Sequence, residues 1–182
     1  MRLVMLDRDG VLNADRPDSV KSPAELVMLA GAAEAVARLN RAGLLVAVCT
    51  NQGVVGRGVI DEAMLERIHA KLRDELARAG ARLDGLFHCA DHPQNPGPRR
   101  KPAPGMLREA MARFRVAPED AAMIGDALID LEAAAAAGCR RILVRSGKGR
   151  RTQGAGLPER VLPVAIHDDL AAAATALIEG RA

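Results

Sequence analysis

The sequence predicts an α/β fold in which one parallel β-sheet lies between two layers of helices. Short apolar runs alternate with longer segments of helical periodicity along the chain, and this alternation is typical of repeated βα units. Several apolar runs are followed directly by acidic or hydroxyl residues, as at the carboxyl ends of strands in open α/β sheets. A length of 182 residues suits one domain, and we expect a single domain over residues 1–182.

The positions of the apolar runs predict the strands, and the segments of helical periodicity predict the helices. Strands are expected at Leu3–Leu6, Leu44–Cys49, Leu86–Cys89, Ala121–Ile124 and Arg141–Val144, with a weaker one at Val161–Ile166 that Pro163 interrupts. Helices are expected at Ala32–Ala42, Glu62–Ala79, Gly105–Phe114, Ile129–Ala137 and Leu170–Ile178. Gly43 and Gly80 are placed to end helices in the left-handed conformation, and Asp61 is placed to cap one.

Two segments lack this periodicity. Val11–Leu29 is polar, and His92–Pro104 contains five prolines. Because loops at the carboxyl edge of such a sheet build its sites, we expect both segments to form walls of a pocket.

The composition restricts the function classes. The net charge of +3 is small, and Phe87 and Phe114 are the only aromatic residues, so nucleic acid is not an expected partner. Three widely spaced cysteines do not suggest a disulfide framework, and the apolar N-terminal stretch stops at Asp7, too early for a membrane span. We therefore expect a cytoplasmic protein without a membrane partner.

The sharpest chemical signal is Asp7-Arg8-Asp9-Gly10, directly after the first apolar run. In an extended chain, side chains alternate, so Asp7 and Asp9 are expected on one side and Arg8 on the other. Two carboxylates that share a small space need a cation, and a hard divalent ion is the usual one.

A second signal, Thr50-Asn51-Gln52-Gly53, follows the second apolar run. A hydroxyl followed by free backbone N–H groups can hold a phosphate group. Taken alone, Thr50 could equally cap the next segment.

The third signal joins Lys101 to Asp126 and Asp130. Lys101 ends the proline-rich segment, and Asp126 follows the run Ala121–Ile124. Asp130 lies four residues further on, so the two carboxylates share a face if a helix has already begun there. One could then bind an ion directly and the other could act in its outer shell.

Together these residues suit phosphoryl transfer. A carboxylate nucleophile can approach an anionic phosphoryl group when Mg²⁺ and a lysine shield the repulsion. We expect Asp7 to attack phosphorus and Asp9 to act as acid and then as base. Mg²⁺ would be held by Asp7, the backbone carbonyl of Asp9 and Asp126, while Thr50 and the Asn51 N–H would bind the transferring group.

The same four motifs resemble those of the haloacid dehalogenase-like phosphatases, at Asp7/Asp9, Thr50, Lys101 and Asp126/Asp130. LDRDGVLN, TNQGVVGRG, RKPAPGML and MIGD are similar to the subgroup of histidinol-phosphate and heptose-bisphosphate phosphatases. The resemblance covers nearly the whole chain and implies a Rossmann-like fold without a large cap domain. No stretch between the motifs is long enough for a cap.

The resemblance also implies a substrate and its binding residues. It points to removal of the C7 phosphate of D-glycero-D-manno-heptose 1,7-bisphosphate, hence to carbohydrate metabolism and lipopolysaccharide core biosynthesis. The partner is then a small sugar phosphate, and a monomer is expected. A guanidinium at Arg100 could clamp the second phosphate. The residues implied in substrate binding are Asp15, Arg16, Pro17, Asp18, Asn51, Gln52, Gly53 and Arg100.

One departure concerns zinc. Many relatives hold a structural zinc with a Cys-x-His pair and a later Cys-x-Cys. Here the stretch reads Cys89-Ala90-Asp91-His92, and no cysteine follows before Lys101. These residues do not supply the four-ligand shell of structural zinc, so we expect none.

Other functions remain open at this point. The enzyme could act on histidinol phosphate, another small phosphomonoester or a polynucleotide 3′-phosphate, or the fold could bind without turnover. A phosphoacceptor receiver module also uses an acidic pair, a Thr and a Lys. Its phosphorylated Asp would follow the third strand and precede the Thr, whereas Thr50 follows the second.

Overall fold

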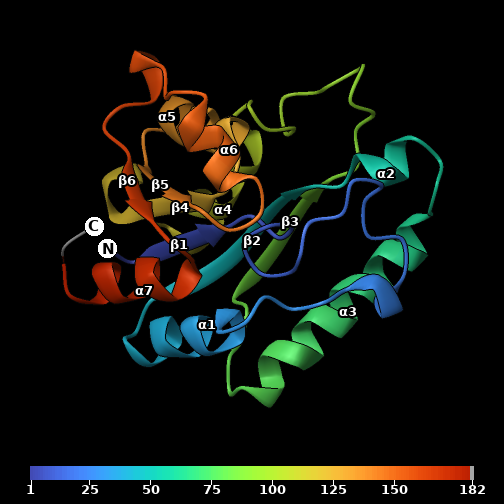
Figure 1. Cartoon of the computed structure of the whole chain (residues 1–182), viewed down its shortest axis with the longest axis horizontal. Helices are drawn as coiled ribbons and strands as arrows, with labels where there is room; N and C mark the ends of the chain where they lie inside the picture. Colours follow the sequence, from blue (N-terminus) through green and yellow to red (C-terminus); the bar gives the residue numbers. More distant parts are fainter. Residues whose placement is uncertain (181–182) are drawn as a thin grey trace.

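The protein is built on a six-stranded, fully parallel sheet with the order β3-β2-β1-β4-β5-β6 (Figure 1). The structure is a computed structural model that describes residues 1–180. The strands are β1 (Leu3–Leu6), β2 (Leu45–Asn51), β3 (Gly85–Cys89), β4 (Ala121–Gly125), β5 (Arg140–Val144) and β6 (Ala165–His167). This order is the doubly wound arrangement, so the predicted α/β class is confirmed.

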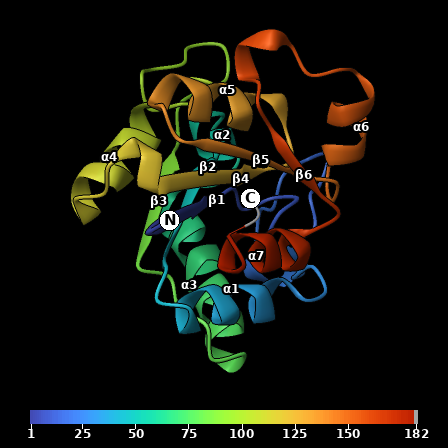
Figure 2. The ribbon, with the colours of Figure 1, turned by 90° about the vertical axis from the view of Figure 1, so that its left-hand side faces the viewer.

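Helices cover both faces of the sheet, which gives the three expected layers (Figure 2). The helices are α1 (Ala32–Arg41), α2 (Gly53–Gly56), α3 (Glu62–Arg78), α4 (Gly105–Phe114), α5 (Leu128–Ala137), α6 (Gly149–Gly154) and α7 (Leu170–Ile178). Single 3₁₀ turns lie at Pro23–Glu25, Pro118–Asp120 and Glu159–Val161.

Side chains alternate between the two faces of the sheet along each strand, so the hydrophobic core has two main clusters, one on each face. In β1, Val4 and Leu6 pack in the cluster with α1, α3 and α7, while Leu3 and Met5 pack in the cluster with α4 and α5. All four side chains are fully buried. A central parallel strand therefore reads as an unbroken apolar run because both faces are covered.

The expected helix ends are confirmed. Gly43 and Gly80 have φ angles of 80° and 70° after α1 and α3, and residues other than glycine rarely adopt this conformation. The Asp61 carboxylate accepts a hydrogen bond of 2.7 Å from the Met64 N–H and so caps α3.

Apart from shifts of one or two residues at the ends of other elements and the single 3₁₀ turns, three elements differ from the sequence prediction. The last strand begins at Ala165 rather than Val161, because Pro163 lacks the N–H of a ladder residue. The short helices α2 and α6 were not expected, since GVVG and GRRTQG show no apolar period. Within residues 1–180 no segment inserted after β1 or β2 forms a separate cap, as expected.

The sheet sets the place of the chemistry. β1, β2 and β4 are adjacent and parallel, so their carboxyl ends meet at one edge. The chain winds in opposite directions on the two sides of β1 and β4, and this switch point is where ligands bind in doubly wound folds. No helix within residues 1–180 is both long and apolar enough to cross a lipid bilayer.

Candidate active site

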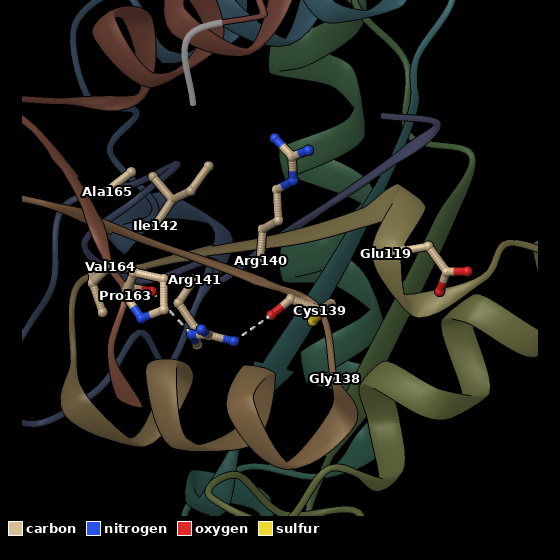
Figure 3. Close-up of a pocket in the computed structure, with 9 residues that line it drawn as sticks. All are labelled: Glu119, Gly138, Cys139, Arg140, Arg141, Ile142, Pro163, Val164 and Ala165. Atoms are coloured by element: carbon tan, nitrogen blue, oxygen red, sulfur yellow. Dashed lines mark hydrogen bonds between the residues drawn. The ribbon is translucent and has the colours of Figure 1, made fainter. Parts of the chain in front are cut away.

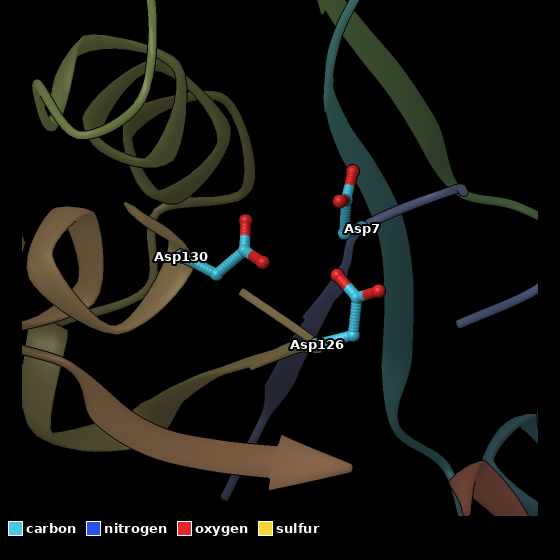
Figure 4. A group of neighbouring side chains, drawn as sticks. All are labelled: Asp7, Asp126 and Asp130. Carbon is cyan, nitrogen blue, oxygen red and sulfur yellow. The ribbon is translucent and has the colours of Figure 1, made fainter. Parts of the chain in front are cut away.

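Three carboxylates converge at the ends of β1 and β4 (Figure 4). Asp7 follows β1, Asp126 follows β4 and Asp130 lies in the first turn of α5. One oxygen of each lies within 4.8 Å of the others. Asp126 precedes the helix, which begins at Leu128, so the condition under which Asp126 and Asp130 would share a helix face is not met. The turn between β4 and α5 nevertheless brings their carboxylates together.

Lys101 enters this cluster from the segment between β3 and α4. Its Nζ lies 3.0 Å from Asp7 Oδ1 and 2.6 Å from Asp130 Oδ1, and Lys101 is 2% exposed. Burial alone would lower the pKa of Lys101, but the Asp130 and Asp7 charges raise it above the usual value. The lysine is therefore a fixed positive charge in the cluster.

One lysine does not balance three carboxylates. Burial, opposed in part by Lys101, raises the pKa of Asp7 above its usual value. Burial and the Asp130 charge raise the pKa of Asp126 to about 7. Crowded carboxylates of this kind bind hard divalent cations, and the all-oxygen donor set fits Mg²⁺.

Asp126 is fixed by tight backbone packing. Its Oδ2 accepts a hydrogen bond of 2.7 Å from the Lys148 N–H, and its carbonyl accepts one of 2.8 Å from the Thr152 hydroxyl. A Cβ added at Gly10 or Gly147 would lie 2.1 or 2.2 Å from Asp126 Oδ2. Both glycines are needed because their backbones line the carboxylate.

The side chain of Asp9 makes a different set of contacts. Arg8 Nη2 lies 3.0 Å from both Asp9 oxygens, while Asn13 and Gln52 donate to Asp9 at 2.8 and 2.9 Å. Burial alone would raise the pKa of Asp9, but the Arg8 charge and these donors hold it below its usual value.

The expectation that Arg8 faces away from Asp9 is therefore wrong. β1 ends at Leu6, so the alternation of extended chain does not continue through residues 7 to 9. The turn that follows allows the Arg8 guanidinium to meet the Asp9 carboxylate.

Thr50 and Asn51 are the last two residues of β2. The Thr50 hydroxyl lies 2.9 Å from Gln52 Nε2 and borders the same pocket as Asp7. The Asn51 amide donates to the Lys101 carbonyl and accepts from the Lys101 N–H. The Asn51 side chain is thus engaged with the chain that carries Lys101.

These residues surround a pocket of about 230 Å³. It is lined by Asp7, Asp9, Asp15, Arg16, Pro17, Ser19, Thr50, Asn51, Gln52, Gly53, Arg100, Lys101, Asp126, Ala127, Ile129 and Lys148. Of the predicted site residues, Asp18 and Asp130 are not in this lining: Asp18 is exposed and pairs with Lys21, and Asp130 lies fully buried behind Lys101. Both irregular segments supply walls, as expected.

Sequence reasoning missed Lys148. It follows β5, its Nζ lies 3.0 Å from Asp15 Oδ2, and both residues line the pocket. Ser19, Ala127 and Ile129 were also missed. Ala127 and Ile129 adjoin predicted residues, but Lys148 stands between two glycines and carries no sequence signal of its own.

The residues expected not to bind zinc form a hydrogen-bonded loop. Asp91 Oδ2 accepts the Gly97 N–H at 2.8 Å, and the Asp91 carbonyl accepts Arg100 Nη1 at 3.1 Å. Within residues 1–180, the carboxylates Asp7, Asp126 and Asp130 form the one group of three or more possible ligands. The absence of zinc remains a prediction.

A larger cavity of about 510 Å³ lies at the opposite edge of the sheet, near the start of β5 (Figure 3). Arg141 donates there to the carbonyls of Cys139, Leu162 and Pro163 at 3.1–3.2 Å. Its guanidinium is therefore engaged with the backbone, and the acidic cluster is not part of this cavity.

Comparison with known proteins agrees with this geometry. A sequence model described as HAD-hydrolase-like matches residues 98–173. D-glycero-beta-D-manno-heptose-1,7-bisphosphate 7-phosphatase of Pseudomonas aeruginosa is 44% identical over 177 residues, which cover 97% of this chain and 98% of the relative. The chain belongs to the haloacid dehalogenase-like phosphatases.

Solved structures of this phosphatase family have the same fold. The crystal structure of D,D-heptose 1,7-bisphosphate phosphatase from B. bronchiseptica, complexed with magnesium and phosphate, has a TM-score of 0.93 and 42% identity and covers 99% of each chain. The corresponding enzyme from Burkholderia thailandensis has a TM-score of 0.76 and 41% identity and covers 98% of this chain and 99% of its own. The comparisons thus support a phosphatase rather than a receiver module.

Proposed function

We propose that this phosphatase hydrolyses a phosphomonoester through an aspartyl-phosphate intermediate on Asp7 and depends on Mg²⁺. The observation that carries this proposal is the group formed by the half-buried Asp7 and the buried Asp126 and Asp130, with the Lys101 ammonium paired to Asp7 and Asp130. A lysine and a cation would together screen the approach of a carboxylate to an anionic phosphoryl group.

In the first step an oxygen of Asp7 attacks phosphorus, and the bond from phosphorus to the ester oxygen breaks. Asp9 gives its proton to the departing alkoxide. The entering phosphate brings negative charge close to Asp9, which favours the protonated carboxyl needed for this step. The Thr50 hydroxyl and the Asn51 N–H bind the transferring oxygens.

In the second step Asp9 accepts a proton from water as that water attacks the phosphoryl group. Phosphate leaves, and the Asp7 carboxylate is restored. Lys101 holds one Asp7 oxygen throughout and opposes the charge that builds up on the phosphoryl group.

The metal ligands would be the Asp7 carboxylate, the backbone carbonyl of Asp9 and Asp126, with Asp130 in the outer shell. The donor set consists of oxygens alone, as Mg²⁺ prefers. When bound, Mg²⁺ supplies positive charge that neutralises the phosphoryl oxygens.

We further propose that the substrate is D-glycero-D-manno-heptose 1,7-bisphosphate and that the C7 phosphate is removed. The relatives that are 40–44% identical bear the name of this activity. Arg100 borders the pocket next to Lys101, where a guanidinium can hold a second phosphate. Asp15, Arg16, Pro17, Gln52 and Gly53, which line the pocket, would contact the sugar.

A phosphate-release panel tests both parts of the proposal. The substrates are the two anomers of the heptose bisphosphate, fructose 1,6-bisphosphate and histidinol phosphate, each with Mg²⁺ and with EDTA. We expect the highest kcat/KM for a heptose bisphosphate and no turnover with EDTA. A preference for histidinol phosphate would refute the proposed substrate, and metal-independent hydrolysis would refute the proposed chemistry.

A further inference from the structure

Two buried polar residues outside the pocket have no part in the chemistry proposed above. Arg8 is 0% exposed, and His69, on α3, is 1% exposed. A buried guanidinium is costly unless its charge is paired and its N–H groups are hydrogen-bonded. Arg8 contacts Asp9, and His69 contacts Arg8.

Arg8 forms a buried ion pair with the Asp9 carboxylate. Its Nη2 is 3.0 Å from both Asp9 oxygens, and its Nε is 3.4 Å from Oδ1. Asn13 Nδ2 donates to Oδ1 and Gln52 Nε2 to Oδ2. Asp9 is thus held by donors on both oxygens, which removes its freedom to rotate before a substrate arrives.

His69 contacts the terminal nitrogen of Arg8 that does not face Asp9. Its Nε2 lies 3.3 Å from Arg8 Nη1. Burial and the Arg8 charge lower the pKa of His69 to about 3, so the ring is neutral and its unprotonated Nε2 can accept the Arg8 N–H. A contact between α3 and the segment after β1 thereby fixes the guanidinium.

We propose that Arg8, braced by His69, is a positioning residue that orients the Asp9 carboxyl toward the ester oxygen and the hydrolytic water. This inference rests on the role of Asp9 proposed above. It makes a prediction that a purely structural role would not make. Disturbing Arg8 should slow those steps in which Asp9 transfers a proton and spare those in which it does not.

Leaving groups separate these steps. An alkoxide leaving from a sugar phosphate needs a proton, whereas p-nitrophenolate is stable enough to leave without one. The second step needs Asp9 as a base whatever the substrate. The variant Arg8→Lys keeps the positive charge but loses the planar fork that holds both oxygens.

The test measures Arg8→Lys against wild type with fructose 1,6-bisphosphate and with p-nitrophenyl phosphate. We expect kcat/KM to fall about 10- to 100-fold for the sugar phosphate and less than about threefold for p-nitrophenyl phosphate. Because the second step is slowed for both, the variant should release a rapid burst of p-nitrophenolate followed by a slower steady rate. Equal losses of kcat/KM for both substrates, or no loss at all, would overturn the proposal.

Two further variants keep the inference testable if Arg8→Lys folds poorly. His69→Gln retains a hydrogen-bond acceptor and should show the same leaving-group pattern with a smaller effect, while His69→Leu should show a larger one. Arg67→Lys, exposed on the same helix, is the matched control and should behave as wild type. If neither His69 variant shows the pattern, the bracing role is refuted.

These kinetic experiments can fail independently of the experiments that test the proposed function. If the phosphate-release panel favours another phosphomonoester, the proposed substrate is wrong, but the test of Arg8 with two leaving groups remains valid. Activity that persists in Asp7→Asn, or in the wild-type enzyme with EDTA, would refute the proposed mechanism. Equal effects on both leaving groups in an otherwise normal phosphatase would refute only the role of Arg8.

Discussion

Asn51 and Lys101 hold each other by two reciprocal hydrogen bonds, although 50 residues separate them. The Asn51 amide donates to the Lys101 carbonyl at 2.9 Å, and the Lys101 N–H donates to Asn51 Oδ1 at 3.1 Å. The carboxyl end of β2 thereby fixes the backbone of the segment that carries Lys101. The lysine side chain can reach Asp7 and Asp130 because its own backbone is anchored in this way.

The variant Asn51→Ala should disturb Lys101 without removing it. With both hydrogen bonds lost, the Lys101 backbone loses its anchor, and we expect kcat/KM to fall about 10- to 100-fold, as for small displacements of catalytic groups. Steady-state kinetics and thermal unfolding measure the effect. Asn95→Ala, at an exposed position of the same segment, is the control and should leave activity unchanged. Wild-type kcat/KM in Asn51→Ala would show that the anchor is dispensable.

The variant Asp7→Asn removes the proposed nucleophile and keeps its shape. We expect kcat to fall by at least about 1,000-fold. The fold should persist, because Lys101 retains its ion pair with Asp130 at 2.6 Å. Phosphate release measures the first effect and thermal unfolding the second. Retention of a tenth of the wild-type kcat would exclude Asp7 as the nucleophile.

The sequence predicted those features that depend on local pattern. Short apolar runs predicted the strands β1 to β5, and helical periodicity of apolar residues predicted the longer helices. Asp7, Thr50 and Asp126 were found because each stands at the carboxyl end of a predicted strand, and parallel strands must bring these ends together. Lys101 was found because it accompanies them in order along the chain.

Features that depend on the folded chain were not predictable. Lys148 reaches Asp15 because the turn after β5 contacts the segment after β1. In the sequence, Lys148 stands between Gly147 and Gly149, and nothing in this stretch indicates a functional residue. The direction of Arg8 depends on where β1 stops, and strand ends are the least certain feature of a sequence prediction. The Asn51 side chain could not be assigned to Lys101 without knowing how the loop closes.

The variant Gly147→Ala should weaken cation binding. The new Cβ would lie 2.2 Å from Asp126 Oδ2 and 2.5 Å from the Gly10 Cα, and Gly147 has a φ of 54° that favours glycine. Asp126 would be displaced, so we expect the Mg²⁺ concentration for half-maximal activity to rise at least about tenfold. Gly154→Ala, where nothing lies within 4 Å of the new Cβ, is the matched control. Equal Mg²⁺ dependence in both variants would contradict this role.

The contribution of Asp126 to stability without Mg²⁺ should fall as the pH rises from about 4 to 7. The pKa of Asp126 is raised from 3.8 to about 7, so between these values the folded protein holds a proton that the unfolded chain has lost. Asp126 therefore lowers the free energy of unfolding as the pH rises across this window, whereas His69, with its lowered pKa, contributes the opposite slope.

Thermal unfolding in EDTA across this pH range measures the effect. The free energy of unfolding of Asp126→Asn should decrease less with pH than that of wild type, since the amide does not titrate. Added Mg²⁺ should raise Tm more at pH 7.5 than at pH 5.5, because protons compete with the cation for the carboxylates. An Asp126→Asn protein with the wild-type slope would show that other groups cause it.

The variant Arg100→Ala tests which part of the substrate this side chain recognises. Arg100 borders the pocket, and its Nη1 is held by the Asp91 carbonyl at 3.1 Å. The neighbouring Arg99 pairs with Glu109 at 3.0 Å and is not among the lining residues. Arg99→Ala is therefore a control of the same residue type in the same loop.

If Arg100 clamps a second phosphate, its removal should lower kcat/KM for a heptose bisphosphate by about 10- to 100-fold, as for loss of a charge-assisted hydrogen bond. A sugar monophosphate lacks that group and should lose less than about threefold. Arg99→Ala should leave both values near wild type. A loss of equal size for both substrates would mean that Arg100 acts on the transferring phosphate or on Lys101, and the preference for a bisphosphate would then have to come from Lys148 or Arg16, the other cationic side chains at the pocket.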